Sequence, residues 1–192
     1  MYFFTSDEHL NHNKPFIYEK RGFPSVAEMN AAILQRHNLV VDKKDTVVHI
    51  GDYAFGHPNQ VFDFIQQLNG HHIFIPGSHD RWIKNQWLGR GSYKHIWESG
   101  RVTVVFARDI WSRTVEGQHI VGCHYSMRTW PRSHYGSWLV YGHSHNGLPP
   151  LGKSVNVAVD LHDFYPVSFI QLKDMMDKLP DNFNMLRNPR RT

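Results

Sequence analysis

The sequence of 192 residues has a single cysteine, Cys123, and no apolar run near the length of about 18 residues that a transmembrane helix needs. One cysteine excludes an internal disulfide framework and a zinc site built from thiolates, and it is typical of a reducing compartment. We therefore expect a cytoplasmic protein without a membrane partner. An excess of one charge is also missing, because the net charge of +4 is too small to indicate a dedicated nucleic-acid surface.

Histidine is the abundant residue, with 15 copies against 17 aspartates and glutamates. Without further cysteines, a metal site would have to use imidazole nitrogen and carboxylate oxygen. The length and the absence of repeats or linkers predict one domain over residues 1–179. Residues 180–192, which hold three of the arginines, are predicted to form a C-terminal tail.

Apolar periodicity and end signals predict alternating strands and helices, which indicates an α/β fold built of packed layers. The capping box Ser25-Val26-Ala27-Glu28 predicts one helix start, and Pro58 predicts another. The helices are expected over 25–40, 58–70 and 168–178. The strands are expected over 2–6, 46–50, 72–75, 102–107, 118–123, 138–141 and 154–159. The strands 102–107 and 118–123 should flank a turn at Glu116-Gly117.

Five of the apolar runs end in residues that bind metals. In chain order these blocks are Asp7-Glu8-His9, Gly51-Asp52, Gly77-Ser78-His79-Asp80, His124 and Gly142-His143-Ser144-His145. Side chains alternate along an extended segment, so the two outer residues of the first block, and the two histidines of the last, should point the same way. Each block alone is commonly a polar loop or turn. Five at strand ends favour a metal site, because ligands of α/β sheets bind there.

The number of candidate ligands indicates two metal ions rather than one. Six residues qualify without Ser78, whereas one ion with an open position needs about three or four. Six or seven suit a pair of ions that share one carboxylate, and Asp52 is the natural bridge. Mixed imidazole and carboxylate ligands favour manganese, with iron, zinc, cobalt or nickel as alternatives, over calcium or magnesium. The six ligands are Asp7, His9, Asp52, His124, His143 and His145.

The five ordered blocks resemble the signature of the calcineurin-like metallophosphoesterases, which reads D-x-H, G-D, G-N-H-D, a lone His and G-H-x-H. The resemblance spans residues 7–145, and a looser likeness to small bacterial and phage members continues through 156–160 and 165–168. It implies an α/β sandwich of two mixed β-sheets with helices on both outer faces.

The resemblance also implies a role for each residue of the blocks. The first ion would be held by Asp7, His9, Asp52 and His145. The second would be held by Asp52, Ser78, His124 and His143. His79 would lie near the leaving group, and Asp80 would orient it.

One position departs from the family signature, because Ser78 stands where the family has asparagine. In the family this asparagine binds the second metal and helps to hold the phosphate. A serine hydroxyl is shorter and is a weaker neutral ligand, so the second metal and full activity are affected rather than the fold. The sequence leaves open whether Ser78 is a natural variant or an engineered change.

These residues predict a phosphoesterase that uses metal-activated hydroxide. The loop 125–137 is rich in arginine and aromatic residues, which favours a nucleotide or nucleic-acid phosphodiester as the substrate. Packing of the loop by its own aromatic residues is an equally good interpretation. Substrate contacts are expected from Arg81, His57 and Arg128. The alternative function is a catalytically weakened or non-catalytic metal-binding scaffold, and the oligomeric state is left open.

Overall fold

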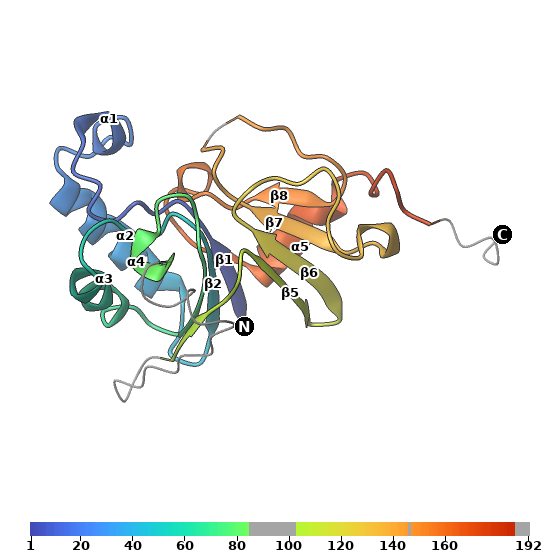
Figure 1. Cartoon of the computed structure of the whole chain (residues 1–192), viewed down its shortest axis with the longest axis horizontal. Helices are drawn as coiled ribbons and strands as arrows, with labels where there is room; N and C mark the ends of the chain where they lie inside the picture. The colour runs from blue at the N-terminus through green and yellow to red at the C-terminus, as the bar shows by residue number, and fades with distance from the viewer. Residues whose placement is uncertain (85–102, 146, 187–192) are drawn as a thin grey trace.

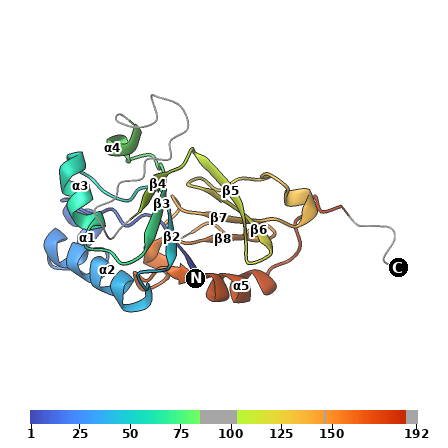
Figure 2. The ribbon, with the colours of Figure 1, turned by 90° about the horizontal axis from the view of Figure 1, so that it is seen from below.

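The computed structural model describes residues 1–84, 103–145 and 147–186. The chain forms two mixed β-sheets that pack against each other, with helices beside them (Figures 1 and 2). This arrangement confirms the predicted α/β class and the two mixed sheets.

The first sheet has the strand order β4-β3-β2-β1-β9. Its strands are β1 (Tyr2–Thr5), β2 (Thr46–Ile50), β3 (His71–Ile75), β4 (Val104–Phe106) and β9 (Val167–Ser168). Strands β1 to β4 run parallel to one another, and β9 is antiparallel to β1. The carboxyl ends of β1, β2 and β3 therefore meet at one edge of the sheet, and three of the predicted ligand blocks follow these ends.

The second sheet has the order β5-β6-β7-β8. Its strands are β5 (Ile110–Val115), β6 (Gln118–Cys123), β7 (Trp138–Tyr141) and β8 (Ser154–Asn156). Strands β5 and β6 form an antiparallel hairpin, whereas β6, β7 and β8 are parallel. The two remaining ligand blocks follow the carboxyl ends of β6 and β7.

The helices of the described part begin at residues suited to helix starts. They are α1 (Pro15–Tyr18), α2 (Val26–Val40), α3 (Pro58–Ile65), α4 (Arg81–Lys84) and α5 (Phe169–Asp177), with the short 3-10 helices η2 (Ser133–Tyr135) and η3 (Val159–Leu161). The Ser25 hydroxyl accepts a hydrogen bond from the Glu28 N–H at 3.2 Å, as the capping box predicts. Ser168 caps α5 in the same way.

The three largest of four apolar clusters in the described residues hold the layers together. The largest lies between the two sheets and includes Phe4, Val48 and Val140, and α5 contributes Leu172 and Met176 to it. A second cluster packs α2, α3 and α4 against the opposite face of the first sheet. Figure 2 shows these helices on the side of the first sheet away from the second sheet. The third covers the other face of the second sheet with a loop side chain, the buried Trp130. The aromatic loop after β6 is thus partly a packing element.

The hairpin of the second sheet differs from the sequence prediction. The partner of β6 across the Glu116-Gly117 turn is β5, over Ile110–Val115, and not the predicted strand 102–107. The apolar run Val104–Phe106 instead forms β4, which pairs in parallel with β3 in the other sheet. Residue 102 lies outside the described residues. The apolar pattern of the sequence does not indicate β5, because four of its six residues are exposed.

The segment predicted as a C-terminal tail contains a buried residue, Asn182, at its third position. The Asn182 amide donates hydrogen bonds to the carbonyls of Ser133 and Ser137 and accepts one from the Lys153 N–H. Residues 187–192 lie outside the described part, and the domain boundary at residue 179 stays a prediction. Among the described helices, none is long and apolar enough to cross a membrane.

Candidate metal centre

The predicted ligands gather into two groups at the edge where the two sheets meet. The first ligand group contains Asp7, His9 and His145, and the second ligand group contains Asp52, His124 and His143. Within each group, the atoms that can bind a metal all lie within 4.8 Å of one another. The six residues reach this edge from four segments of the chain, 7–9, 52, 124 and 143–145, and the fold brings them together.

Backbone turns, rather than strand alternation, aim these side chains. Asp7, His9, Asp52 and His143 all have positive φ angles, of 58°, 51°, 55° and 66°. Such left-handed conformations are uncommon for residues other than glycine and cost free energy. We predicted that Asp7 and His9, and likewise His143 and His145, point the same way because their segments are extended. The segments are not extended, so this reason is wrong. The chain leaves β1, β2 and β7 through tight, strained turns that present these ligands at the edge.

Two glycines allow these turns to approach each other closely. A Cβ atom at Gly142 would collide with the Asp7 carboxylate, and one at Gly77 would collide with the Asp52 carboxylate and backbone. Both carboxylates therefore occupy space that every other residue type would fill.

Asp52 lies between the two groups, as expected of a bridging ligand. Its Oδ2 atom is 3.3 Å from His124 Nε2 and 3.9 Å from His9 Nε2, which belongs to the other group. The Ser78 hydroxyl donates to the same Oδ2 atom at 3.0 Å. The His79 backbone N–H donates to Asp52 Oδ1 at 2.7 Å, and its exposed ring lies 4.0 Å from Oδ2. The block 77–80 thus surrounds the shared carboxylate.

Asp80 fixes the backbone of the two turns that carry Asp52 and Gly77. Its buried carboxylate accepts hydrogen bonds from the N–H groups of Asp52, Tyr53 and Gly77 and from the Trp82 indole, at 2.6–3.0 Å. All of its hydrogen bonds in the described part go to these four donors. Asp80 therefore fixes the turn that carries Asp52, and the predicted orientation of His79 by Asp80 stays a prediction.

Sequence reasoning missed a carboxylate that orients His145. The Asp160 Oδ2 atom lies 2.7 Å from His145 Nδ1, which leaves Nε2 directed at the ligand group. Arg21 donates to both Asp160 oxygens at 2.8 Å and to the backbone carbonyls of Asp7 and Glu8. A carboxylate behind a ligating histidine fixes its ring and raises its basicity. Two features of the sequence point toward this pair: Asp160 ends the block 156–160, and Arg21 lies close in sequence to the block Asp7-Glu8-His9.

Charge and burial determine which forms the ligands adopt. Burial raises the pKa of Asp7 to about 6 and lowers the pKa of His9 to about 3, so His9 keeps a free lone pair. Burial also opposes ionisation of Asp52, but the His124 ring 3.3 Å away and the hydrogen bond from the His79 N–H keep its pKa below the ordinary value. The hydrogen bond with Asp160 raises the pKa of His145.

Several buried atoms of the centre lack a protein partner. Asp7 Oδ1 and His124 Nε2 are buried and have no hydrogen bond within the described residues. The other nitrogen of His124 bonds to the Ile50 carbonyl at 3.0 Å, so Nε2 is the atom left for a ligand. The Nε2 atoms of His9 and His145 face each other at 3.2 Å. Nitrogen and carboxylate donors in this arrangement fit two divalent transition-metal ions.

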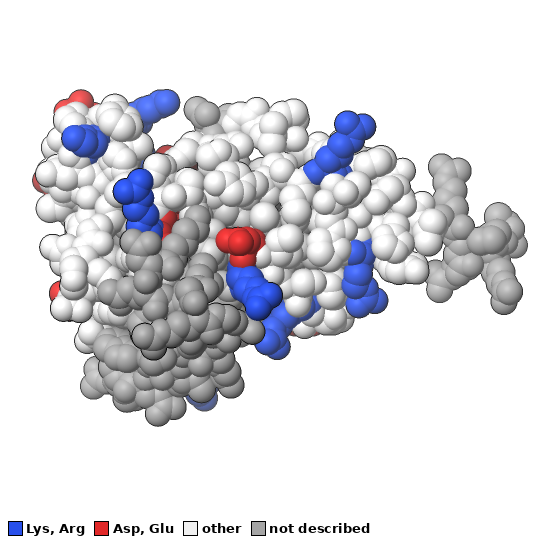
Figure 3. Space-filling view, viewed as in Figure 1, with Lys and Arg blue, Asp and Glu red and all other residues white. Residues whose placement is uncertain are grey.

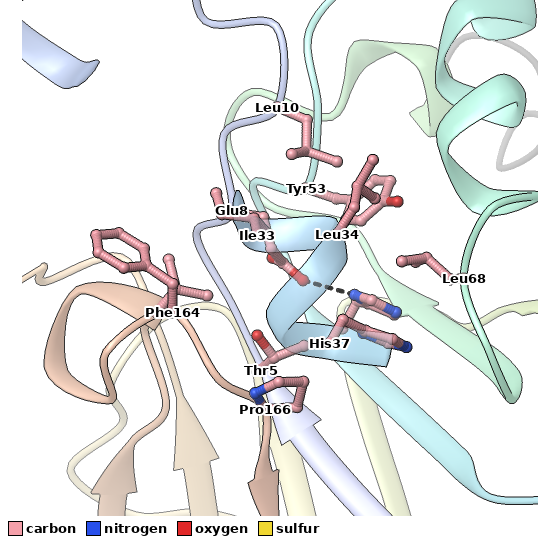
Figure 4. A pocket seen from close by; sticks show the side chains of 12 residues that line it. Thr5, Glu8, Leu10, Ile33, Leu34, His37, Tyr53, Leu68, Phe164 and Pro166 are labelled. Carbon is pink, nitrogen blue, oxygen red and sulfur yellow. Dashed lines mark hydrogen bonds and ion pairs between the residues drawn. The ribbon is translucent and has the colours of Figure 1, made fainter. Parts of the chain in front are cut away.

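A buried polar cluster supports the centre from behind. Glu8, between two of the ligands, points the other way and lies 2.6 Å from His49 Nδ1, and His49 Nε2 lies 3.0 Å from His72 Nδ1. Burial raises the pKa of Glu8 to about 8 and lowers that of His49 to about 3, so the cluster is uncharged near neutral pH. Figure 4 shows Glu8 and His37 beside a cavity under α2 that offers about 10 Å³, too little for a substrate.

The three predicted substrate contacts are dispersed around the centre. Arg81 is exposed and begins α4, directly after Asp80. His57 is exposed and caps α3, where its ring accepts a hydrogen bond from the Asn59 N–H. Arg128 lies over the Phe183 ring at 5.9 Å, beside a hollow of about 610 Å³. Their contact with a substrate stays a prediction.

Comparisons with known proteins show relatives of similar length. No family model matches this chain. An uncharacterized protein of Methanocaldococcus jannaschii is 25% identical over 185 residues, which cover 92% of this chain and 91% of the relative. The structure of a protein of unknown function from Aquifex aeolicus has a TM-score of 0.64 at 18% identity and covers 91% of this chain and 98% of its own. The fold is therefore shared along almost the whole chain.

A phosphoesterase from E. coli, YfcE, aligns with a TM-score of 0.41 at 15% identity, over 82% of this chain and 77% of its own. A predicted phosphoesterase from Streptococcus pneumoniae aligns with a TM-score of 0.37 at 13% identity, over 82% and 70%.

Proposed function

We propose that this protein is a dinuclear metal-dependent phosphoesterase that hydrolyses phosphodiesters of the nucleotide type. The observation that carries the proposal is the pair of ligand groups that meet at Asp52. Asp7, His9 and His145 would hold one ion, His124 and His143 the other, and Asp52 would join them. Manganese suits these donors, as do iron, zinc, cobalt and nickel.

The chain's own residues supply positioning and proton transfer. When bound, a pair of divalent ions lowers the pKa of a water molecule and neutralises the charge on phosphate oxygens. His79, whose side chain is 52% exposed at the edge of the centre, can donate a proton to the departing oxygen of the ester. Its backbone N–H bond to Asp52 keeps the ring beside the centre.

The surroundings of the centre favour a small diester over a long nucleic acid. His143 and His79 are exposed, so a phosphate that carries two substituents can reach the ligands from solvent. The Lys and Arg side chains on the face in Figure 3 are scattered singly over the described residues and form no continuous stripe. A long nucleic acid needs many phosphate contacts in a row, and the described Lys and Arg residues of this face are not arranged in such a row.

The test compares hydrolysis of bis(p-nitrophenyl) phosphate and p-nitrophenyl phosphate by the full-length protein with Mn²⁺. We expect metal-dependent hydrolysis that favours the diester, which chelation abolishes and added Mn²⁺ restores. Asp52→Asn should lower the rate by about 10²–10³-fold or more, because it weakens the ligand common to both groups. His71→Ala, at an exposed position at the start of β3, is the control and should retain the wild-type rate.

Ser78 supports the alternative of a weakened or non-catalytic metal-binding scaffold. Its hydroxyl donates to Asp52 instead of offering an amide oxygen to the centre. A protein that binds Mn²⁺ at both groups but hydrolyses neither ester, even with asparagine at position 78, would establish the scaffold and contradict the proposed activity.

A further inference from the structure

A hollow of about 620 Å³ opens directly beside the metal centre, and we name it the α1 hollow. It lies between α1 and the segment 160–164, and Phe16, Lys20, Arg21, Asp160 and Phe164 line it together with His145. His145 belongs both to this hollow and to the first ligand group. A substituent on a phosphate held at the centre can therefore extend into it.

A row of aromatic rings connects the α1 hollow to the centre. Phe16 contacts the His12 ring, with the ring centres 5.5 Å apart, and His12 contacts Phe55 at 4.4 Å. Phe55 stacks on the ligand His9 at 5.7 Å, with 24° between the ring planes. Phe16 itself is 65% exposed, so it presents a large ring to the hollow and to solvent rather than to the core.

The other wall of the hollow is also aromatic and is held firmly. Phe164 packs edge-on against Phe23 at 5.2 Å, and the Arg36 guanidinium lies 5.2 Å from the centre of its ring. The charges of Arg21 and Asp160 compensate each other through their two hydrogen bonds. Among the described lining residues, Lys20 at the exposed rim is left as the uncompensated charge.

We propose that the α1 hollow binds the flat base of a nucleotide-type substrate while the phosphate lies at the metal centre. The placement of the phosphate rests on the proposed function. Bases stack on aromatic side chains whatever their sequence, and both walls offer such rings. The volume lies within the range of small-molecule sites, and the Lys20 ammonium at the rim complements the negative phosphate. The hollow would therefore select nucleotides over esters that lack an aromatic group.

Calorimetric binding of AMP and ribose 5-phosphate to the full-length protein, with and without Mn²⁺, tests the proposal. The two ligands share the phosphate and the sugar and differ in the base. AMP should bind the wild type about 5- to 100-fold more tightly, and Phe16→Ala should remove most of that difference. Phe16→Trp should keep it. Phe16 is exposed and no residue of α1 is fully buried, so these substitutions should leave the fold intact.

Phe183→Ala is the matched control, because Phe183 is 59% exposed and lines the other hollow, next to Arg128. It should leave the preference for AMP unchanged. The proposal is overturned if AMP binds no more tightly than ribose 5-phosphate, if Phe183→Ala costs as much as Phe16→Ala, or if hexyl phosphate binds more tightly than AMP. Binding is measured apart from hydrolysis. If the protein prefers AMP but hydrolyses no ester, base binding in the α1 hollow is supported and only the proposed esterase function is contradicted.

Discussion

Ser78 and Asp160 show how single side chains set the properties of the centre. Ser78 donates a hydrogen bond to the shared carboxylate of Asp52, so it competes with a metal for the same oxygen atoms. Asp160 acts on the first ligand group through His145. The sequence indicated the first residue through a departure from a motif. It could not indicate the pairing of Asp160 with Arg21, because these residues lie 139 positions apart and meet only in the fold.

Replacing Ser78 by asparagine should strengthen the second ligand group. An asparagine oxygen reaches farther from the backbone than a hydroxyl, and its amide adds a donor for the charge of the transition state. We expect Ser78→Asn to raise kcat by about 10²–10³-fold and to increase the amount of Mn²⁺ bound per chain. Steady-state kinetics and metal analysis measure both quantities. Ser126→Asn, at an exposed position, is the control, and unchanged activity and stoichiometry in Ser78→Asn would show that serine already serves as a ligand.

Replacing Asp160 by asparagine should weaken the first ligand group. The change removes the negative charge that fixes the His145 ring, and it leaves Arg21 without its ion-pair partner. We expect about 10- to 100-fold weaker Mn²⁺ binding, measured by calorimetry. Asp163→Asn makes the same change at an exposed position three residues away. Equal metal affinities in the two variants would show that Asp160 does not support the centre.

The turns that follow the strands are the elements that build the site. Sequence patterns located the strands before these turns well, because the strands are buried and apolar. They could not show the left-handed conformations of Asp7 and Asp52, since only the packed turns stabilise them. The patterns also missed β5, an edge strand whose exposed polar residues hide its periodicity.

Gly142→Ala tests the close approach of the turn after β7. Its Cβ atom would collide with the Asp7 carboxylate and the Ser6 side chain, so Asp7 must move away from its ligand position. We expect the variant to fold with lowered stability and to lose Mn²⁺ at the first ligand group. Gly147→Ala provides the matched control, because a Cβ atom there meets nothing within 4 Å. Metal analysis and circular dichroism measure the metal content and the folding of both variants. If Gly142→Ala retains its metal, the Cβ atom does not displace Asp7 as we expect.

At the scale of the whole molecule, two sets stand out among the described histidines. Some reach the metal centre, while His37, His49 and His72 are buried together between α2 and the first sheet. The sequence suggested metal binding from the number of histidines, and it could not separate the two sets. The histidines of both sets lie in or directly after strands and helices with similar apolar patterns. Only the packing of α2 on the first sheet buries His37, His49 and His72.

The buried histidines should make stability depend on pH. Burial lowers the pKa of His37 to about 3, whereas an unfolded histidine has a pKa near 6.5. Between these values the unfolded chain binds a proton that the folded chain does not, so acidification favours unfolding. We expect the free energy of unfolding of the wild type to fall, relative to His37→Gln, by about 1.4 kcal/mol per pH unit from pH 6 to 4. Urea unfolding at each pH measures this difference, and parallel curves would contradict it.

We propose that the fold assembles a pair of metal sites joined by Asp52. Anomalous scattering from crystals of the full-length protein soaked in Mn²⁺ tests it most directly. We expect two peaks about 4 Å apart, one beside Asp7, His9 and His145 and a weaker one beside His124 and His143, with Asp52 between them. A single peak, or two peaks separated by more than about 10 Å, would contradict a dinuclear centre, because one carboxylate cannot bridge that distance.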